Sequence, residues 1–220
     1  NKKIKYVIGD QNDVLSRLIQ CADHVHASDV IRITSECPFP YVKLFEKCWN
    51  LHKDNNNDAT FLDEIIDGCG LEIISKKALE ISHEQGSSIH RSELCSLFIR
   101  ENIENFRVQI LKPDNKLIRR DLRLTVDNPE DLVVCREVYN YLKKNKLVKS
   151  PDISMVVDFL DSNIHLKKLI EPYCDVGYST MYIKKEKTKN TGQSLYKKAK
   201  SLIPGGNMFL SKRPEMFLPE

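Results

Sequence analysis

Several features that would settle the class of a protein at once are missing from this chain of 220 residues. It has no apolar run of about 20 residues, the length that a helix needs to cross a bilayer. Its first residues lack the apolar stretch of a secretory signal peptide. Seven cysteines are scattered without a Cys-x-x-Cys pair, and their odd number argues against a closed disulfide framework. We therefore predict a soluble protein of the reducing cytoplasm, without a membrane partner.

A strong charge of one sign is also absent. The 34 basic and 31 acidic residues leave a net charge of +3, which is too small to predict a nucleic-acid partner. One biased stretch, residues 184–192, is rich in Lys, Thr, Asn and Gly and has no apolar period, so we interpret it as a linker. The hydrophobic content of 41% is enough for one main domain of ordinary size.

Short apolar segments alternate with helical patterns along most of the chain. Ser75 is suited to cap one of the helices. Alternation of strands with helices of this length favours βαβ units and a mixed or mostly parallel sheet. Periodicity and turn residues predict, in order, a strand at 6–8, a helix at 13–27, a strand at 29–34, a helix from 38 or 40 to about 53, an extended segment at 59–62, a strand at 71–74, helices at 75–84 and 91–101, strands at 106–111 and 122–126, and helices at 129–144, 150–160 and 192–203.

The carboxylate of Asp127 is the first candidate for a functional group. It follows the β-branched strand predicted at 122–126, and Pro129 opens the next helix. Ligands of open α/β sheets bind beyond the carboxyl ends of the strands, so a metal ligand is well placed here. A helix cap is equally well placed, and Asp127 or Asn128 suits that role. The residues alone leave both interpretations open.

Three blocks in a fixed order carry a resemblance to a known family. They are Gly9-Asp-Gln-Asn-Asp-Val-Leu-Ser-Arg17, Asp29-Val-Ile-Arg-Ile-Thr-Ser-Glu-Cys-Pro38 and Leu122-Arg-Leu-Thr-Val-Asp-Asn-Pro-Glu-Asp-Leu132. This part of the chain resembles the cytidylyltransferases of bacterial surface-polysaccharide synthesis, above all the spore-coat polysaccharide protein F group, which is related to enzymes that make CMP-linked acidic sugars. The resemblance implies an α/β, three-layer nucleotide-diphospho-sugar transferase-like (Rossmann-like) fold with a mixed sheet and a helical C-terminal extension.

The chemistry that the resemblance implies is nucleotidyl transfer from CTP to a sugar or a small phosphorylated acid, with Mg²⁺ as the cofactor. The implied metal ligands are Glu36 and Asp127. Glu36 stands where the family has the Asp of a Gly-Asp-Cys-Pro turn, so its carboxylate is one methylene longer and Ser35 replaces the glycine. Because Mg²⁺ requires near-ideal octahedral geometry, this difference bears directly on metal binding. The sequence identifies no catalytic acid, base or nucleophile.

The resemblance also implies a set of substrate-binding positions. Two of them have structural alternatives. Arg32 could form an ion pair at the strand end, and Asp67 with Gly68 could simply form a turn. Leu94 replaces a histidine of the family segment near the acceptor, which implies altered acceptor recognition. The implied substrate-binding residues are Arg32, Asp67, Glu72, Arg91 and Glu93.

Family members begin with a strand and a Gly/Arg-rich loop that holds the triphosphate, and no such loop occurs in this sequence. The resemblance therefore predicts a domain that lacks its first βαβ portion, about 60 residues. Residues 193–207 resemble the first helix and turn of glutamate-1-semialdehyde aminomutase-like, PLP-dependent aminotransferases. The predicted organisation is a partial cytidylyltransferase domain at 1–170, a linker at 171–192 and the start of an aminotransferase-like domain at 193–220. Any PLP would bind in a downstream domain that this sequence does not contain.

Three functions follow as hypotheses. The first is the C-terminal part of a cytidylyltransferase that is inactive as this fragment and whose partners are CTP and a sugar or phosphorylated acceptor. The second is a degenerate, non-catalytic module that scaffolds or dimerises with the fused aminotransferase. The third is a stand-alone nucleotide-binding regulator. A homodimer is compatible with each of them.

Overall fold

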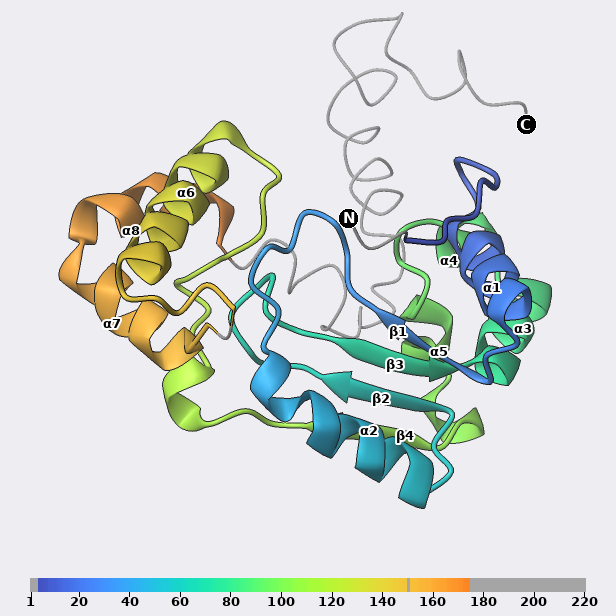
Figure 1. Ribbon diagram of the computed structural model, residues 1–220. Helices are drawn as coiled ribbons and strands as arrows, with labels where there is room; N and C mark the ends of the chain where they lie inside the picture. The colour runs from blue at the N-terminus through green and yellow to red at the C-terminus, as the bar shows by residue number, and fades with distance from the viewer. Residues whose placement is uncertain (1–3, 150, 175–220) are drawn as a thin grey trace, which may run out of the picture. The chain divides into compact units, whose positions relative to one another are not determined.

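The computed structural model describes residues 4–149 and 151–174 (Figure 1). The chain divides into two units, residues 1–182 and 183–220, and all described residues belong to the first unit. The linker at 184–192 and the helix at 192–203 lie outside the described residues and stay predictions.

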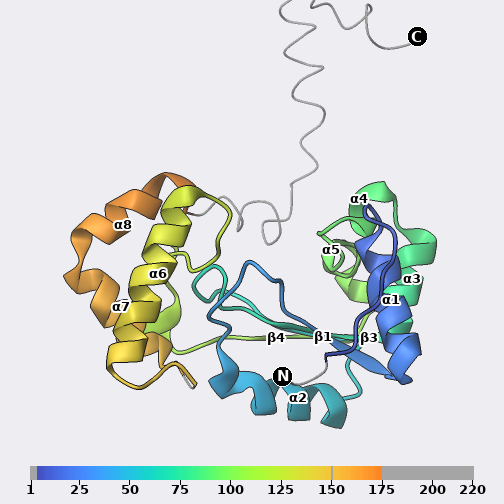
Figure 2. The same ribbon diagram turned by 45° about the horizontal axis from the view of Figure 1, so that its top comes forward.

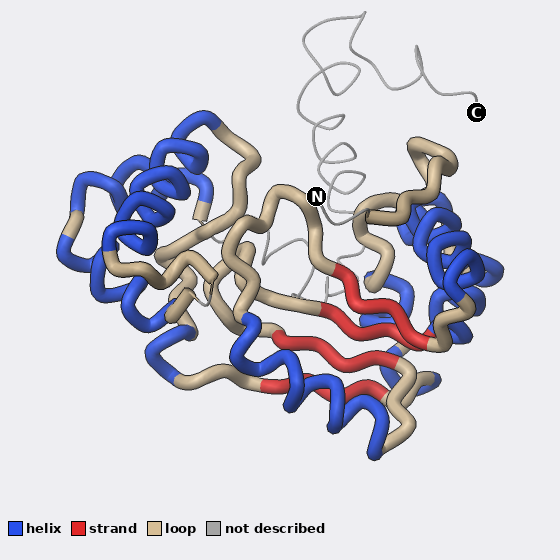
Figure 3. Tube along the Cα trace, viewed as in Figure 1, coloured by secondary structure: helices blue, strands red, loops and turns tan. Residues whose placement is uncertain are grey.

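A four-stranded mixed sheet forms the centre of this unit, in the order β1-β3-β2-β4 (Figures 1 and 3). The predicted mixed sheet is confirmed, although most of its pairs are antiparallel. β3 is antiparallel to β1 and β2, whereas β2 and β4 are parallel. The connection over 63–71 is too short for a crossover, so β3 must return antiparallel to β2. The strands are β1 (Asp29–Arg32), β2 (Ala59–Leu62), β3 (Glu72–Ser75) and β4 (Val108–Leu111).

Helices cover both faces of the sheet (Figure 2). Successive strand residues point to opposite faces, so Phe61 packs in one core with Leu79, while Leu62 packs in another with Cys48. All four residues of β2 are buried, as expected for a strand covered on both sides. The helices near the sheet are α1 (Val14–Val25), α2 (Phe45–Asp54), α3 (Lys76–Gln85), α4 (Ser88–Arg91) and α5 (Leu97–Glu101).

Three further helices group beside one end of the strands (Figure 1). The chain reaches them after β4, so they lie toward the carboxyl ends of β1, β2 and β4. Their buried side chains, among them Val134, Val156 and Leu166, join the same core as α2. The predicted helical extension is therefore part of the main packing. These helices are α6 (Pro129–Lys144), α7 (Ile153–Ser162) and α8 (Ile164–Ile170).

Cap residues fix where two helices begin. Ser75 accepts a hydrogen bond from the backbone N–H of Ala78 (3.2 Å), which confirms it as the N-cap of α3. Asn128 is the N-cap of α6 and forms a capping box with Asp131, whose side chain accepts from the Asn128 N–H (2.9 Å). Asn128 therefore supplies the cap that the sequence assigned to either Asp127 or Asn128.

Two strand predictions are wrong. Residues 6–8 form no strand, and their large side chains are exposed, with Tyr6 at 79% and Ile8 at 85%. An extended apolar segment becomes a strand only when it forms hydrogen bonds with a neighbouring strand, and no described strand pairs with residues 6–8. Residues 122–126 form a buried extended segment with only an isolated bridge between Arg123 and Asp67, because a tight turn rather than a strand lies beside it.

The helix predicted at 91–101 begins only at Leu97. Ser92 already has an extended backbone, and its hydroxyl donates to the carbonyl of Ile89 (2.7 Å). Arg32 donates to the carbonyl of Glu93 (2.8 Å). These bonds hold the backbone at 92–96 outside a helix.

Candidate functional site

A pocket of about 580 Å³ lies at the carboxyl end of β1 and the adjacent amino end of β3. It is lined by residues of five segments that are distant in sequence. They are the end of β1 with the loop after it (32–37), the turn before β3 with its first residue (67–72), residues 93–94, the segment before α6 (123–128), and Tyr173. This is the place where open α/β sheets bind ligands.

Backbone contacts hold the three central segments together. The N–H of Val126 donates to the carbonyl of Glu36 (2.9 Å), and the N–H of Leu124 donates to the carbonyl of Asp67 (2.7 Å). Gly68 has φ +86, and a Cβ at this position would lie 2.5 Å from the backbone carbon of Leu124. The turn can therefore approach the 123–128 segment only because residue 68 is glycine.

Arg123 is the electrostatic centre of one wall and is 5% exposed. Its Nε donates to Oδ1 of Asp131 (2.9 Å), its Nη2 donates to Asp127, and its Nη1 donates to the carbonyl of Tyr173 (2.9 Å). Nη1 also lies 3.5 Å from the carboxylate of Asp67. Burial lowers the pKa of Arg123, but the surrounding carboxylates outweigh burial and leave that pKa above its usual value.

Asp67 is in a different electrostatic position from the other carboxylates around Arg123. Its closest described cationic contact is 3.5 Å long, and the same guanidinium makes shorter bonds to Asp131 and Asp127. Burial raises the pKa of Asp67, and the attraction of Arg123 does not restore it to its usual value because Asp127 and Asp131 repel the charge.

A second charged network lies where β1 and β3 pair. Arg32 donates to Oε2 of Glu72 (2.9 Å), and Arg100 donates to Oε1 of Glu72 (3.2 Å). Arg100 also forms a two-pronged pair with Asp63, with distances of 2.7 and 3.1 Å. Burial raises the pKa of Glu72, but the two arginines and the hydroxyl of Ser96 outweigh burial and leave it below its usual value. This network is balanced in charge and supports the pocket wall.

The structure brings together all but one of the residues predicted to bind metal or substrate. Arg91 is the exception, because its guanidinium donates to the carbonyl of His83 (2.9 Å) and it does not line the pocket. Arg32 forms the strand-end ion pair that was the plain alternative to nucleotide binding. The predicted residues that line the pocket are Arg32, Glu36, Asp67, Glu72, Glu93 and Asp127.

Sequence reasoning missed Arg123, Asp131 and Tyr173. A signal for the first was available, because an arginine inside the apolar run Leu122-Arg-Leu-Thr-Val needs a buried partner. The carboxylates of Asp127 and Asp131 lie four and eight residues after Arg123. No comparable signal marks Tyr173, whose backbone carbonyl makes the contact.

The fit of these residues to Mg²⁺ is partial. Mg²⁺ is usually held by one or two carboxylates, with water and phosphate oxygens as its other ligands. Glu36 and Asp127 supply two carboxylates on adjoining loops. Asp127, however, already accepts hydrogen bonds from Arg123 and from the hydroxyl of Thr125 (3.2 Å). Across residues 4–149 and 151–174, no three His, Cys, Asp or Glu side chains form a cluster suited to a metal ion.

Cys37 also lines the pocket, beside Glu36. Its Sγ lies 3.0 Å from the hydroxyl of Thr34, and burial raises the pKa of its thiol. A nucleophilic cysteine needs a lowered pKa or an adjacent base. The described surroundings of Cys37 provide neither, so this thiol packs against the loop.

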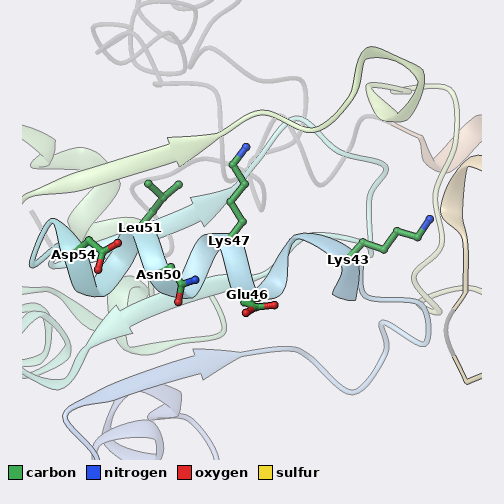
Figure 4. Close-up of a pocket in the computed structure, with 6 residues that line it drawn as sticks. All are labelled: Lys43, Glu46, Lys47, Asn50, Leu51 and Asp54. Atoms are coloured by element: carbon green, nitrogen blue, oxygen red, sulfur yellow. The ribbon is translucent and has the colours of Figure 1, made fainter.

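A second hollow, of about 460 Å³, follows the outer face of α2 (Figure 4). All of its lining residues come from this helix and the short turn before it, at spacings of one helical turn. Lys43 is paired with Asp152 (2.7 Å). Because a single helix face lines it, this hollow lacks the converging loops of the first pocket. In the part of the chain that the structure describes, no helix is long and apolar enough to cross a membrane.

The fold is similar to that of a solved nucleotidyltransferase. A solved cytidylyltransferase from Leptospira borgpetersenii serovar Hardjo-bovis (strain JB197) superposes with a TM-score of 0.64 at 20% identity, over 72% of this chain and 66% of that chain. Likeness at this identity shows the shared fold, a mixed sheet between helices, and confirms the predicted fold class.

Two curated relatives are similar in sequence. The spore coat polysaccharide biosynthesis protein SpsF of Bacillus subtilis (strain 168) is 28% identical over 147 residues, which are 66% of this chain and 59% of the relative. The uncharacterized protein MJ1063 of Methanocaldococcus jannaschii is 29% identical over 161 residues, which are 73% of this chain and 65% of that protein. The chain thus spans less than two thirds of each relative. No family model matches it.

Proposed function

We propose that this chain belongs to a nucleotidyltransferase that moves a cytidylyl group from CTP to a sugar or a small phosphorylated acid for surface-polysaccharide synthesis. One observation carries the proposal. Two loops with candidate metal carboxylates, Glu36 and Asp127, meet in one pocket of a cytidylyltransferase-like fold. The similarity to a spore coat polysaccharide biosynthesis protein supports the biosynthetic context.

In the proposed reaction, an oxygen of the acceptor attacks the α-phosphorus of CTP. A new P–O bond forms, the bond to the β-phosphate oxygen breaks, and pyrophosphate leaves with the electron pair. A hydroxyl nucleophile releases its proton to solvent, and a phosphate nucleophile has none to release. Mg²⁺, held by Glu36 and Asp127, would neutralise phosphate charge. The Arg123 and Arg32 networks keep the loops in place, and the pocket orients the acceptor.

The triphosphate of CTP requires phosphate-binding groups that the described pocket does not provide. Its two arginines, Arg32 and Arg123, are engaged by carboxylates and carbonyl oxygens, and phosphate binding usually uses basic side chains and clustered backbone N–H groups. β1 also has a sheet neighbour on one side only among the described strands. We therefore propose that further polypeptide completes the sheet and supplies the triphosphate loop, and that the isolated chain does not turn over CTP.

A second candidate function is a non-catalytic module that scaffolds or dimerises with an aminotransferase fused downstream. The observation that favours it is the engagement of Asp127 by Arg123 together with the replacement of the expected aspartate by Glu36. On this alternative the pocket is a remnant, and the PLP-dependent reaction belongs to the downstream domain. A cytoplasmic location fits both candidates.

Pyrophosphate release from CTP, Mg²⁺ and a panel of sugar acceptors tests the choice on the complete gene product. The D127N and E36Q variants are expected to lose activity by about 100-fold or more, the scale for loss of a preorganised electrostatic contact. D158N is the matched control, because Asp158 is an exposed residue of α7 that pairs with Lys116. Absence of turnover with every acceptor, together with absence of Mg·CTP binding, would favour the scaffold.

A further inference from the structure

The two oxygens of the Asp127 carboxylate are in different situations. Nη2 of Arg123 and the hydroxyl of Thr125 (3.2 Å) both donate to Oδ2. No hydrogen bond from the described residues reaches Oδ1. The side chain is 53% exposed and lines the pocket. The carboxylate is therefore held through one oxygen, and the other oxygen is available to a ligand.

Asp131 fixes both the backbone of Asp127 and the group that binds its side chain. Asp131 is 1% exposed and lies in the first turn of α6. Its Oδ2 accepts from the backbone N–H of Asp127 (3.1 Å) and from Nη2 of Arg123 (3.1 Å), and its Oδ1 accepts from Nε of Arg123 (2.9 Å). One buried carboxylate thus sets where Asp127 begins and where its Oδ2 is bound.

The guanidinium of Arg123 has little freedom to turn. Its Nη1 donates to the carbonyl of Tyr173 (2.9 Å) and lies 3.5 Å from the carboxylate of Asp67. All three of its nitrogens therefore have partners, and a planar group held in this way cannot rotate without breaking several bonds. Nη2 meets Oδ2 of Asp127 from a fixed direction, so the orientation of that carboxylate is fixed as well.

We infer that Arg123 and Thr125 are positioning residues, which hold Oδ2 of Asp127 so that Oδ1 is the oxygen presented to a divalent cation. The inference rests on the proposed function, in which Glu36 and Asp127 hold Mg²⁺. Hydrogen bonds to ligating carboxylates are a usual feature of metal sites, where they orient the ligand. Arg123 shares its single charge with Asp131, to which it makes two bonds, so it does not cancel the charge of Asp127.

Titration of the intact chain with Mn²⁺ tests this role without turnover. Mn²⁺ takes the same oxygen ligands as Mg²⁺, and the electron paramagnetic resonance signal of the free ion reports how much is bound. Thr125→Val removes the hydroxyl and keeps a side chain of similar shape. It should weaken Mn²⁺ binding by about tenfold, the lower end of the range for loss of a group that orients a metal ligand. Thr125→Ser keeps the hydroxyl and should restore the affinity of the unaltered chain.

Arg123→Lys keeps the positive charge but not the planar fork, so it should also weaken Mn²⁺ binding. If Arg123 and Thr125 instead compete with the cation for Asp127, their replacement strengthens binding. Mn²⁺ binding in T125V that is as tight as in the unaltered chain, or tighter, therefore overturns the inference. Failure of T125S to restore the affinity overturns it as well, because packing rather than the hydroxyl would then be responsible.

Three further variants separate this inference from the proposed function. E36Q and D127N should both weaken Mn²⁺ binding, whereas D158N, which removes an exposed carboxylate of α7, should not. If E36Q and D127N weaken binding and T125V does not, the positioning role fails and the proposed metal ligands stand. If the unaltered chain binds no Mn²⁺, or if E36Q and D127N bind it normally, the inference and the proposed metal ligands fail together.

Discussion

Replacement of Arg123 by methionine is the sharpest test of how this site is built. Arg123 is 5% exposed and bonds to Asp131, which is 1% exposed, at 2.9 and 3.1 Å. Methionine roughly matches the aliphatic part of the side chain but leaves the Asp131 carboxylate buried without its cation. Breaking a buried pair in this way costs about 3–5 kcal/mol. The bond to the carbonyl of Tyr173 is lost as well.

A double-mutant cycle separates the buried charge from ordinary packing. The amide side chain in the D131N variant keeps an oxygen that can accept from the N–H groups of residues 127 and 128, which Asp131 now accepts at 3.1 and 2.9 Å. The double variant R123M/D131N therefore keeps the capping geometry without an unpaired charge. We expect it to be more stable than R123M alone by about 1 kcal/mol or more.

Urea unfolding followed by tryptophan fluorescence measures these differences. Trp49 is the single tryptophan and packs against the core that includes α6 and α7. A change in midpoint at constant slope reports the change in unfolding free energy. A loss below about 1 kcal/mol in R123M, the size of an ordinary surface effect, would refute the reasoning. A double variant that is no more stable than R123M would refute it equally.

Two further predictions concern the acidic network and the turn. Glu72 has a lowered pKa, so its contribution to stability is present above its unfolded pKa of about 4.3 and is lost as pH falls through the folded value. Burial outweighs Arg100 and raises the pKa of Asp63, so its contribution is present below an unfolded pKa of about 3.9 and is lost as pH rises through the folded value. Between about pH 3 and 6, the urea midpoint should rise with pH less steeply in E72Q than in the unaltered chain, and more steeply in D63N. Slope changes of the same sign in the two variants would contradict this. G68A should lose about 1–3 kcal/mol from its positive φ alone, with the clash against Leu124 added. In the comparison variant G9A the added Cβ meets only side-chain atoms, with Cγ of Arg17 at 2.7 Å, and φ is not positive, so its loss should be smaller than that of G68A. Equal midpoints for the two variants would count against a tight turn.

Elements with strong local signals were predictable from the sequence. The helix at 129–144 has the predicted bounds, and those at 13–27, 75–84 and 150–160 differ from the observed helices by a few residues at their ends. Apolar periodicity and cap residues act within a few positions, so a single sequence contains them. The strands at 6–8 and 122–126 failed because an extended segment becomes a strand only beside a partner, which local sequence does not reveal.

Six of the residues that line the pocket were predictable from the sequence, whereas Arg123, Tyr173 and the interactions within the site were not. The resemblance of ordered blocks led to Glu36 and Asp127, and the structure brings both into one pocket. The partners of these residues were not predictable. Glu72 is 40 positions from Arg32, and the pairing of β1 with β3 places the two residues opposite each other. Asp127 is held by Arg123, which no motif had marked.

The sequence by itself determined most of the longer helices, which residue caps α3, and where a carboxylate would stand before α6, because these depend on contacts over short distances along the chain. Only the tertiary structure decided that Asn128 caps α6 and that Arg32 is neutralised by Glu72. It also decided that Arg123 pairs with three carboxylates, of which Asp67 makes the longest contact. Ion-pair partners are chosen by proximity in space and by burial, both of which arise when distant loops pack together.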